Sequence, residues 1–286
     1  MIFSVAYSLV WGMFFMSFSF TKMSGNGNDF IIIDNRLNDA NELINKDFVV
    51  KVCARGLSIG ADGLIFIEKS NKADFKWRFY NSDGTEAAMC GNGARCAARY
   101  AYINNIAPKE MTFETGAGII EGFIMDNGEV KVLLTPPHSF KDNLPNISVE
   151  DTSYKPYFIN TGVPHAVIFT DKVDSVNVMT VGSVIRHHNL FAPEGTNVNF
   201  ASVTAASSMK VRTFERGVEG ETLACGTGCT AAALVAVKEG LVESPVKVLT
   251  AGGKILTVYS NGDKVYLQGE ARLVYKGIIN TEAYNY

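Results

Sequence analysis

Basic residues are too few in this sequence to give it an overall positive charge. Lys and Arg total 26 against 29 Asp and Glu, so the formal net charge at pH 7 is -3. A chain this close to neutrality has no broad positive field for a phosphate backbone, which argues against general nucleic-acid binding. Only 19% of the residues are charged and 47% are hydrophobic, which excludes a disordered chain and provides for a sizeable core.

Cysteine is scarce as well, with five residues in 286. A disulfide scaffold needs denser cysteine in a shorter chain, and an odd count leaves one thiol over in any full pairing. We therefore expect free thiols in a reducing compartment, which places the protein in the cytoplasm. Close Cys-x-x-Cys pairs, typical of zinc sites and of thiol–disulfide oxidoreductases, are missing, so we expect no metal site.

Charge is missing altogether from residues 1–20, and the run from Met1 to Met16 is largely apolar. A secretory signal opens with Lys or Arg and closes at a small-residue cleavage site, and neither is present. Several serines also weaken the run as a membrane span, which needs about 20 apolar residues. Alternation over 17–21 predicts a half-buried strand, so we expect the soluble domain to begin at Met16. For the apolar extension 1–15, two interpretations stay open: a start-site artefact, which we favour, and a weak anchor.

The rest of the chain is rich in short strand-like segments separated by turn residues. Turn pairs such as Asn127-Gly128 lie between them, as hairpins require. The predicted strands are 30–34, 64–67, 75–80, 118–124, 130–134, 157–159, 165–170, 209–214, 246–249, 255–259, 264–268 and 272–275.

Helical stretches are fewer. Residues 39–55 have helical spacing, and 93–103 and 228–238 are rich in alanine, which favours helix. The proline-containing stretch 136–145 reads as a linker between two halves.

Two short segments half a chain apart resemble each other. Residues 89–94 read Met-Cys-Gly-Asn-Gly-Ala, and 224–229 read Ala-Cys-Gly-Thr-Gly-Cys. Each follows predicted strands and runs into one of the alanine-rich helices. The simplest interpretation is two similar halves, each with a cysteine at the start of its helix, facing each other across a cleft.

A cysteine at such a position suits proton transfer. The first helical turn has unpaired N–H groups and the positive end of the helix dipole, which favour a thiolate and also bind carboxylates. Two facing thiols could bracket one carbon atom: the thiolate removes a proton and the thiol delivers one to the opposite face. This inverts a stereocentre and requires no metal or organic cofactor. For Cys53 and Cys96 the simpler interpretation is that of small buried hydrophobes.

Three longer segments resemble the diaminopimelate epimerase family. They are Asn81–Arg95 (NSDGTEAAMCGNGAR), Glu215–Gly228 (ERGVEGETLACGTG) and Lys22–Phe30 (KMSGNGNDF), and the resemblance runs in order from about Met16 to about Lys276. It implies an isomerase without cofactor that interconverts L,L- and meso-diaminopimelate, late in the synthesis of lysine and of peptidoglycan precursors. It also implies diaminopimelate as the small-molecule partner and a homodimer. From the charge balance and the serines of the first segment, we expect neither nucleic acid nor membrane as a partner.

The resemblance also implies a fold. It is an α/β structure of the α+β type with two pseudo-symmetric domains, each a curved, mainly antiparallel sheet around a central helix. The last strands of the family return to the first domain. We therefore expect an N-terminal domain of residues 16–137 plus 270–286 and a C-terminal domain of 138–269.

The family's functional residues can be placed by matching motifs. Cys90 and Cys225 match the two acid/base thiols, and His165 and Glu215 match groups beside them. The resemblance implies a substrate-binding set that combines helix-start backbone with side chains for the distal amino-acid end. That set is Asn28, Asn81, Gly91, Asn92, Asn197, Glu215, Arg216, Gly226 and Thr227.

The sequence departs from the family pattern at several places. The family often has Gln where Gly63 stands and Asn where Val163 stands, so we expect one lost side-chain contact at each. Asn160 is a candidate to compensate. The signature serine is Thr85 here, and one extra residue separates Arg216 from Cys225. These differences bear on substrate range and affinity more than on reaction type.

Two other functions remain as alternatives. A related two-cysteine racemase would act on proline or hydroxyproline, but it would not need Arg216 and several asparagines for a distal amino-acid group. A redox or binding protein without catalysis would instead join Cys90 to Cys225 in a disulfide. Thiol titration beside an activity assay separates the second alternative from an epimerase.

Overall fold

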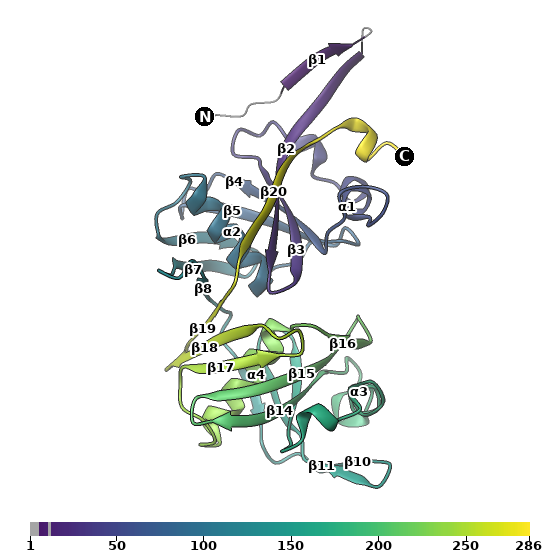
Figure 1. Ribbon diagram of the computed structural model, residues 1–286, viewed down its shortest axis with the longest axis vertical. Coiled ribbons are helices and arrows are strands. Elements are labelled where there is room, and N and C mark those ends of the chain that lie inside the picture. Colours follow the sequence, from purple (N-terminus) through teal and green to yellow (C-terminus); the bar gives the residue numbers. More distant parts are fainter. Residues whose placement is uncertain (1–5, 11–12) are drawn as a thin grey trace. The chain divides into compact units, whose positions relative to one another are not determined.

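The computed structural model describes residues 6–10 and 13–286 and shows a mixed α/β protein, mostly sheet, with four α-helices in this described part (Figure 1). The chain forms two compact units. The first combines the described residues up to Val132 with Glu270–Tyr286, and the second comprises Leu133–Gly269. The second unit is therefore an insertion between the early strands and the last strand of the first.

The first unit contains most of its strands before the insertion and one after it (Figure 1). Its elements are β1 (Ala6–Val10), β2 (Met13–Gly25), β3 (Asn28–Asp34), α1 (Lys46–Cys53), β4 (Gly63–Glu68), β5 (Phe75–Asn81), α2 (Gly91–Ile103), β6 (Glu110–Thr115), β7 (Gly118–Ile124), β8 (Val130–Leu133) and β20 (Arg272–Ile279).

The second unit has a short β-hairpin, β10 and β11, apart from its main sheet. Its elements are β9 (His138–Lys141), β10 (Ile147–Val149), β11 (Thr152–Tyr154), β12 (Tyr157–Asn160), β13 (Pro164–Phe169), α3 (Val178–Arg186), β14 (Asn197–Ala205), β15 (Ser208–Glu215), β16 (Gly220–Thr222), α4 (Gly226–Lys238), β17 (Val246–Thr250), β18 (Ile255–Asn261) and β19 (Lys264–Gly269).

Both units repeat one order of elements, and the strand pairings match as well. In the first unit β3 runs parallel to β4, β4 is antiparallel to β5, and β5 leads through α2 to its parallel neighbour β6. In the second unit β13, β14, β15, α4 and β17 follow the same pattern. This repeat, with its mixed and mainly antiparallel sheets, confirms the expected pseudo-symmetric fold class.

An alanine-rich helix lies at the centre of each unit. The helix α2 packs against β2, β3 and β7, and α4 packs against β13, β14 and β18. Their alanines are buried because small side chains let a helix approach a curved sheet closely. The fully or almost fully buried alanines are Ala94, Ala97, Ala98 and Ala101 in α2, and Ala231, Ala232, Ala233 and Ala236 in α4.

A shorter helix covers another part of each sheet. In the first unit α1 contributes Phe48, Val49 and Val52 to a core cluster with residues of β3 and β4. In the second unit α3 packs against β14 and β15 within an equivalent cluster. Each sheet is therefore sandwiched between a short helix and a central one.

Each predicted strand is confirmed to within a residue or two at its ends or as part of a longer strand, but two expectations about the connections are wrong. The helix expected over 39–55 is only α1, because Asn45 caps it by accepting a hydrogen bond from the Phe48 N–H. The expected linker over 136–145 contains the strand β9, which pairs with β12.

The residues before Met16 extend the sheet where the structure describes them. The strand β1 pairs antiparallel with β2, and β2 already begins at Met13. The rest of the extension 1–15, namely 1–5 and 11–12, lies outside the described residues. Within the described part, no helix has the length and apolar character needed to cross a membrane.

Candidate active site

Cys90 is the N-cap of the central helix of the first unit. Its backbone is extended, and α2 begins at the next residue, Gly91. The backbone N–H of Gly93 donates to Cys90 Sγ at 3.5 Å, so the sulfur faces the N–H groups of the first helical turn. A negative charge on this sulfur is stabilised by those groups.

Two of the predicted side chains come together around this cysteine. Asn28 Oδ1 lies 3.9 Å from Cys90 Sγ and accepts a hydrogen bond from Asn92 Nδ2 at 3.3 Å. Asn28 follows a two-residue hairpin turn, Asn26-Gly27, in which both residues have positive φ. Such a turn requires Asn or Gly and fixes the register of β2 against β3.

A cluster of charges behind Asn28 fixes how its amide is oriented. Asn28 Nδ2 donates to Asp62 Oδ2 at 2.6 Å, which leaves Oδ1 for the cysteine side. Asp62 is joined to Asp29 through Arg55, and Lys22 forms an ion pair with Asp29 at 2.8 Å. Burial alone would raise the pKa of Asp29, but its bonds to Arg55 and Lys22 outweigh burial and lower the pKa to about 2.

The depressed pKa predicts how Asp29 affects stability at acid pH. Its contribution is present above the unfolded-state pKa of about 4 and is lost as pH falls towards 2. In urea unfolding, the difference in the free energy of unfolding between wild type and Asp29→Asn should shrink by about 1 kcal/mol from pH 5 to pH 2. This figure includes a reduction for solvent screening of the partly exposed carboxylate. The exposed Asp151→Asn is the control. An unchanged gap for Asp29→Asn would contradict the network.

Cys225 occupies the equivalent N-cap position in the second unit. It is buried, with 6% of its surface exposed, and α4 begins at Gly226. Cys225 Sγ lies 3.5 Å from the hydroxyl oxygen of Thr227. The Thr161 hydroxyl donates to the Thr227 carbonyl and so ties the helix start to the end of β12.

Beneath this helix start lies His165, which is fully buried in β13. Its Nδ1 is 3.1 Å from Asn199 Nδ2, and Asn199 Oδ1 accepts a hydrogen bond from the Thr213 hydroxyl at 3.0 Å. His165 Nε2 has no hydrogen-bond partner among the described residues. Burial, aided by the positive charge of Arg216, lowers the pKa of His165 to about 3, so the imidazole is neutral near pH 7.

Glu215, Arg216 and Asn197 lie where β14 and β15 meet. Asn197 pairs with His165 across β13 and β14, and its Oδ1 accepts from the backbone N–H of Arg216 at 2.8 Å. Burial raises the pKa of Glu215. The Arg216 guanidinium donates to the Glu194 carbonyl at 3.3 Å.

The structure gives a physical reason for one departure from the family pattern. A Cβ at Gly63 would lie 2.6 Å from the Tyr80 carbonyl oxygen and 2.7 Å from the Phe79 ring, so no side chain fits there. Asn160 Oδ1 accepts from the Gly162 N–H within its own loop. Asn81, the last residue of β5, donates to the Thr85 hydroxyl at 3.1 Å, within the turn that follows the strand.

Several site residues escape prediction from the sequence. Asp29, Asp62, Lys22 and Arg55 form the charge cluster, but only their convergence in space reveals it. Asn199 could have been identified as a candidate from the sequence, because it lies two residues after Asn197 and therefore on the same face of β14.

Two further cysteines of the first unit are buried as protonated thiols. Burial raises the pKa of both Cys53 and Cys96 to about 12, so these thiols stay protonated. No group of three or more His, Cys, Asp or Glu side chains among the described residues could hold a metal ion.

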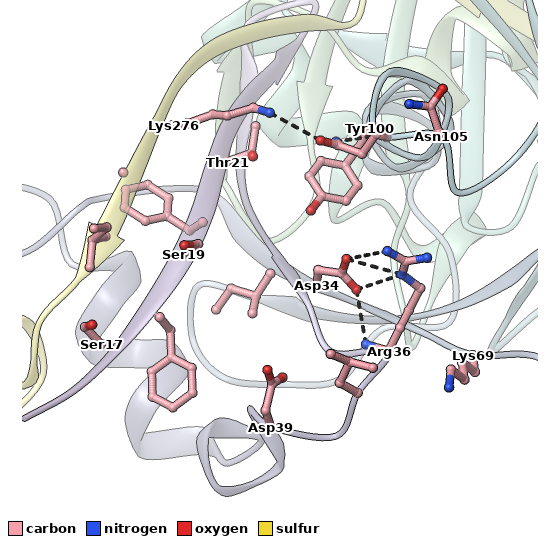
Figure 2. Close-up of a pocket in the computed structure, with 17 residues that line it drawn as sticks. Ser17, Ser19, Thr21, Asp34, Arg36, Asp39, Lys69, Tyr100, Asn105 and Lys276 are labelled. Atoms are coloured by element: carbon pink, nitrogen blue, oxygen red, sulfur yellow. Dashed lines mark hydrogen bonds and ion pairs between the residues drawn. The ribbon is translucent and has the colours of Figure 1, made fainter. Parts of the chain in front are cut away.

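A cavity of about 690 Å³ in the first unit contains none of the predicted site residues. Figure 2 shows its lining, with Asp34 and Arg36 paired on one side and Lys276 on another. Lys276 Nζ donates to Asn104 at the end of α2. The cavity is therefore separate from the helix start at Cys90.

Sequence comparison finds one family across most of the chain. The family profile described as "Diaminopimelate epimerase" matches residues 20–139 and 157–274. A curated diaminopimelate epimerase of Hydrogenobaculum sp. (strain Y04AAS1) is 50% identical over 275 residues, covering 92% of this chain and 99% of the relative. The diaminopimelate epimerase of Aquifex aeolicus is 46% identical, covering 93% and 99%.

Solved structures share the fold at much lower identity. A Bacillus anthracis phenazine biosynthesis protein of the PhzF family has a TM-score of 0.68 and 17% identity, covering 92% of this chain and 99% of its own. A hydroxyproline epimerase from Agrobacterium vitis has a TM-score of 0.66 and 13% identity, covering 93% of each. At these identities the likeness concerns the fold alone.

Proposed function

This chain belongs to the diaminopimelate epimerase family, and so to the isomerases, and on that premise we propose that it interconverts L,L- and meso-diaminopimelate without a cofactor. The proposal rests mainly on the positions of Cys90 and Cys225, which are the N-caps of the central helices of two equivalent units. We also take the two compact units to be the two epimerase domains. The division between Val132 and Leu133 and the return of Glu270–Tyr286 to the first unit support this assignment.

In this mechanism the two thiols act on opposite faces of the substrate α-carbon. One cysteine, as thiolate, takes the α-proton, and the C–H electron pair is left on the carbon and its carboxylate. The other cysteine, as thiol, donates its proton to the opposite face and becomes the thiolate. The configuration is inverted, and the reverse reaction exchanges the roles of the sulfurs.

The backbone at both helix starts stabilises the charge that builds up during this transfer. The N–H groups that follow Cys90 and Cys225 belong to Gly91, Asn92, Gly226 and Thr227, and they would bind the reacting carboxylate. A glycine at the first helical position lets the ligand approach the backbone closely. Asn28 and Asn92 add amide groups on the Cys90 side.

Arg216 is proposed to bind the distal carboxylate of diaminopimelate. A guanidinium can form two parallel hydrogen bonds with a carboxylate. The backbone of Arg216 is held in place because its N–H donates to Asn197 Oδ1. We expect Arg216→Ala to raise KM by roughly 10–100-fold, because one charge-assisted contact with the substrate is lost. The change in kcat should be smaller. Steady-state kinetics would measure this, with Arg212→Ala, four residues earlier within β15, as the control. An unchanged KM for Arg216→Ala would show that Arg216 does not bind the distal end.

The direct test of the function is proton NMR of the purified protein with L,L-diaminopimelate in D2O under reductant. The expected result is loss of the α-proton signal together with appearance of the meso isomer. No turnover, with the fold intact and the thiols confirmed free, would overturn the proposal and direct the test to proline and hydroxyproline.

A homodimer is proposed on the basis of the last strand. Within the described part of the chain β20 pairs only with β2, so its other edge is open. Leu273, Val274 and Ile278 on this strand are 41%, 54% and 61% exposed, and an open apolar edge is a site for pairing with a second strand. Sedimentation equilibrium should give twice the chain mass of 31.1 kDa, and Val274→Lys should shift the protein to the monomer. A monomer in wild type would contradict this assembly.

A further inference from the structure

A buried polar triad in the second unit replaces an apolar triad in the first. His165 pairs with Asn197, and two residues further on Asn199 pairs with Thr213. In the first unit Phe30 pairs with Gly63, and two residues further on Ile65 pairs with Phe79. The equivalent positions are therefore His165, Asn199 and Thr213 in one unit, and Phe30, Ile65 and Phe79 in the other.

The triads lie in the same place relative to the central helices. A Cβ built on Gly93 in α2 would meet Ile65 and Phe30 at 3.5 Å. A Cβ on the matching Gly228 in α4 would lie 2.2 Å from Asn199 Oδ1, 3.2 Å from Thr213 Oγ1 and 3.2 Å from Cys225 Sγ. The polar triad is thus packed directly under the turn that carries Cys225.

The amide of Asn199 can point only one way. Its Nδ2 lies 2.9 Å from the Ala166 carbonyl oxygen, which can only accept a hydrogen bond. Its Oδ1 accepts from the Thr213 hydroxyl. A flipped amide would set two acceptor oxygens against each other, so the nitrogen must face Ala166 and His165.

This orientation fixes the proton on the imidazole. Asn199 Nδ2 donates to His165 Nδ1, so Nδ1 carries the lone pair and the proton of the neutral ring is on Nε2. That Nε2–H is fully buried and has no partner among the described residues. Burying an unpaired donor is costly, and such groups occur where a ligand or a reaction uses them.

We propose that Asn199 is a positioning residue that holds His165 as the neutral Nε2–H tautomer, so that His165 serves the reaction as a hydrogen-bond donor and not as a proton acceptor. The functional half of this proposal rests on the epimerase activity proposed above. The tautomer itself depends only on the contacts of Asn199.

The test is nitrogen NMR of protein labelled with 15N-histidine. His138, His187 and His188 lie at or near the surface, whereas His165 is fully buried. The signals of His165 should not titrate between about pH 5 and 8 and should show one protonated nitrogen, Nε2. Protonation on Nδ1 in wild type, or titration of His165 in this range, would overturn the proposal.

Two variants distinguish the hydrogen bond that Asn199 Nδ2 donates from the packing of the Asn199 side chain. In Asn199→Asp the carboxylate can only accept, so both nitrogens of His165 should become protonated near pH 7. Thr213→Val keeps the volume and leaves Asn199 held by Ala166, so His165 should retain its wild-type signals. The same signals in Asn199→Asp as in wild type would also contradict the proposal. If Asn199→Asp does not fold, the wild-type spectrum still tests the proposal, because it shows which nitrogen of His165 is protonated.

Kinetics supply a second readout. Asn199→Asp should lower kcat by roughly 10–100-fold and change KM much less, because the residue acts through His165 rather than on the substrate. The exposed Asn143→Asp introduces the same charge and should leave both parameters unchanged. A KM effect without a kcat effect would contradict the positioning role. Absence of any diaminopimelate turnover in wild type would count against the proposed function and leave the NMR result standing.

Discussion

Replacing either Cys90 or Cys225 with alanine should lower kcat for epimerisation by about 10³-fold or more, because each stereoisomer needs one sulfur to take a proton and the other to give one. Alanine retains the Cβ and the extended N-cap backbone, so the fold should survive. The measurement is conversion of L,L- to meso-diaminopimelate, with circular dichroism to check folding.

Cys53→Ala is the matched control for both variants. Cys53 is the buried last residue of α1, and its thiol stays protonated because burial raises the pKa to about 12. Its removal should cost some stability but leave kcat within about twofold. Substantial turnover in Cys90→Ala or Cys225→Ala would contradict the mechanism with two thiols.

Arg95→Met should destabilise the protein by about 2–4 kcal/mol, since hydrogen bonds to a charged group contribute about 1.5–3 kcal/mol each and several are lost together. Arg95 is fully buried in α2. Its guanidinium donates to Asn26 Oδ1 at 2.9 Å, to Asn92 Oδ1 at 2.7 Å and to the Gly91 carbonyl at 3.3 Å. One side chain therefore joins the β2–β3 turn to the helix start beside Cys90.

Urea unfolding would measure the loss, with Arg99→Met as the control from the next turn of α2. Arg99 is half-buried and donates to the Gly128 carbonyl, so its replacement should cost less, about 1 kcal/mol. Equal costs for the two variants would show that burial of Arg95 adds nothing to its contribution. We also expect reduced activity in Arg95→Met, because Asn92 and the hairpin turn lose their common anchor.

Local patterns predicted the parts of the site that are set by neighbouring residues. A cysteine followed by Gly-x-Gly and a run of alanines indicates a helix start, and both helices begin within two residues of the expected position. The polar triad was not predictable in this way. His165, Asn199 and Thr213 come together only through the register of three strands, and no sequence pattern states that register.

The helix α3 shows why the fold was only partly predictable. Its sequence, Val-Met-Thr-Val-Gly-Ser-Val-Ile-Arg, is rich in β-branched residues with low helix propensity. The helix forms because one of its faces is buried against β14 and β15. That face consists of Val178, Val181 and Ile185. Tertiary contacts therefore outweigh local preference in α3, whereas at Asn45 a local cap shortened the helix expected over 39–55.

The pairing of β2 with β20 has a consequence for how the protein is made. It joins residues near the beginning of the chain, such as Phe18, to residues near its end, such as Ile279. On the ribosome the whole inserted unit, Leu133–Gly269, emerges before β20 does. The first unit is therefore completed only after the second has been translated, and until then one edge of β2 lacks its partner β20 and is open to pairing with other strands.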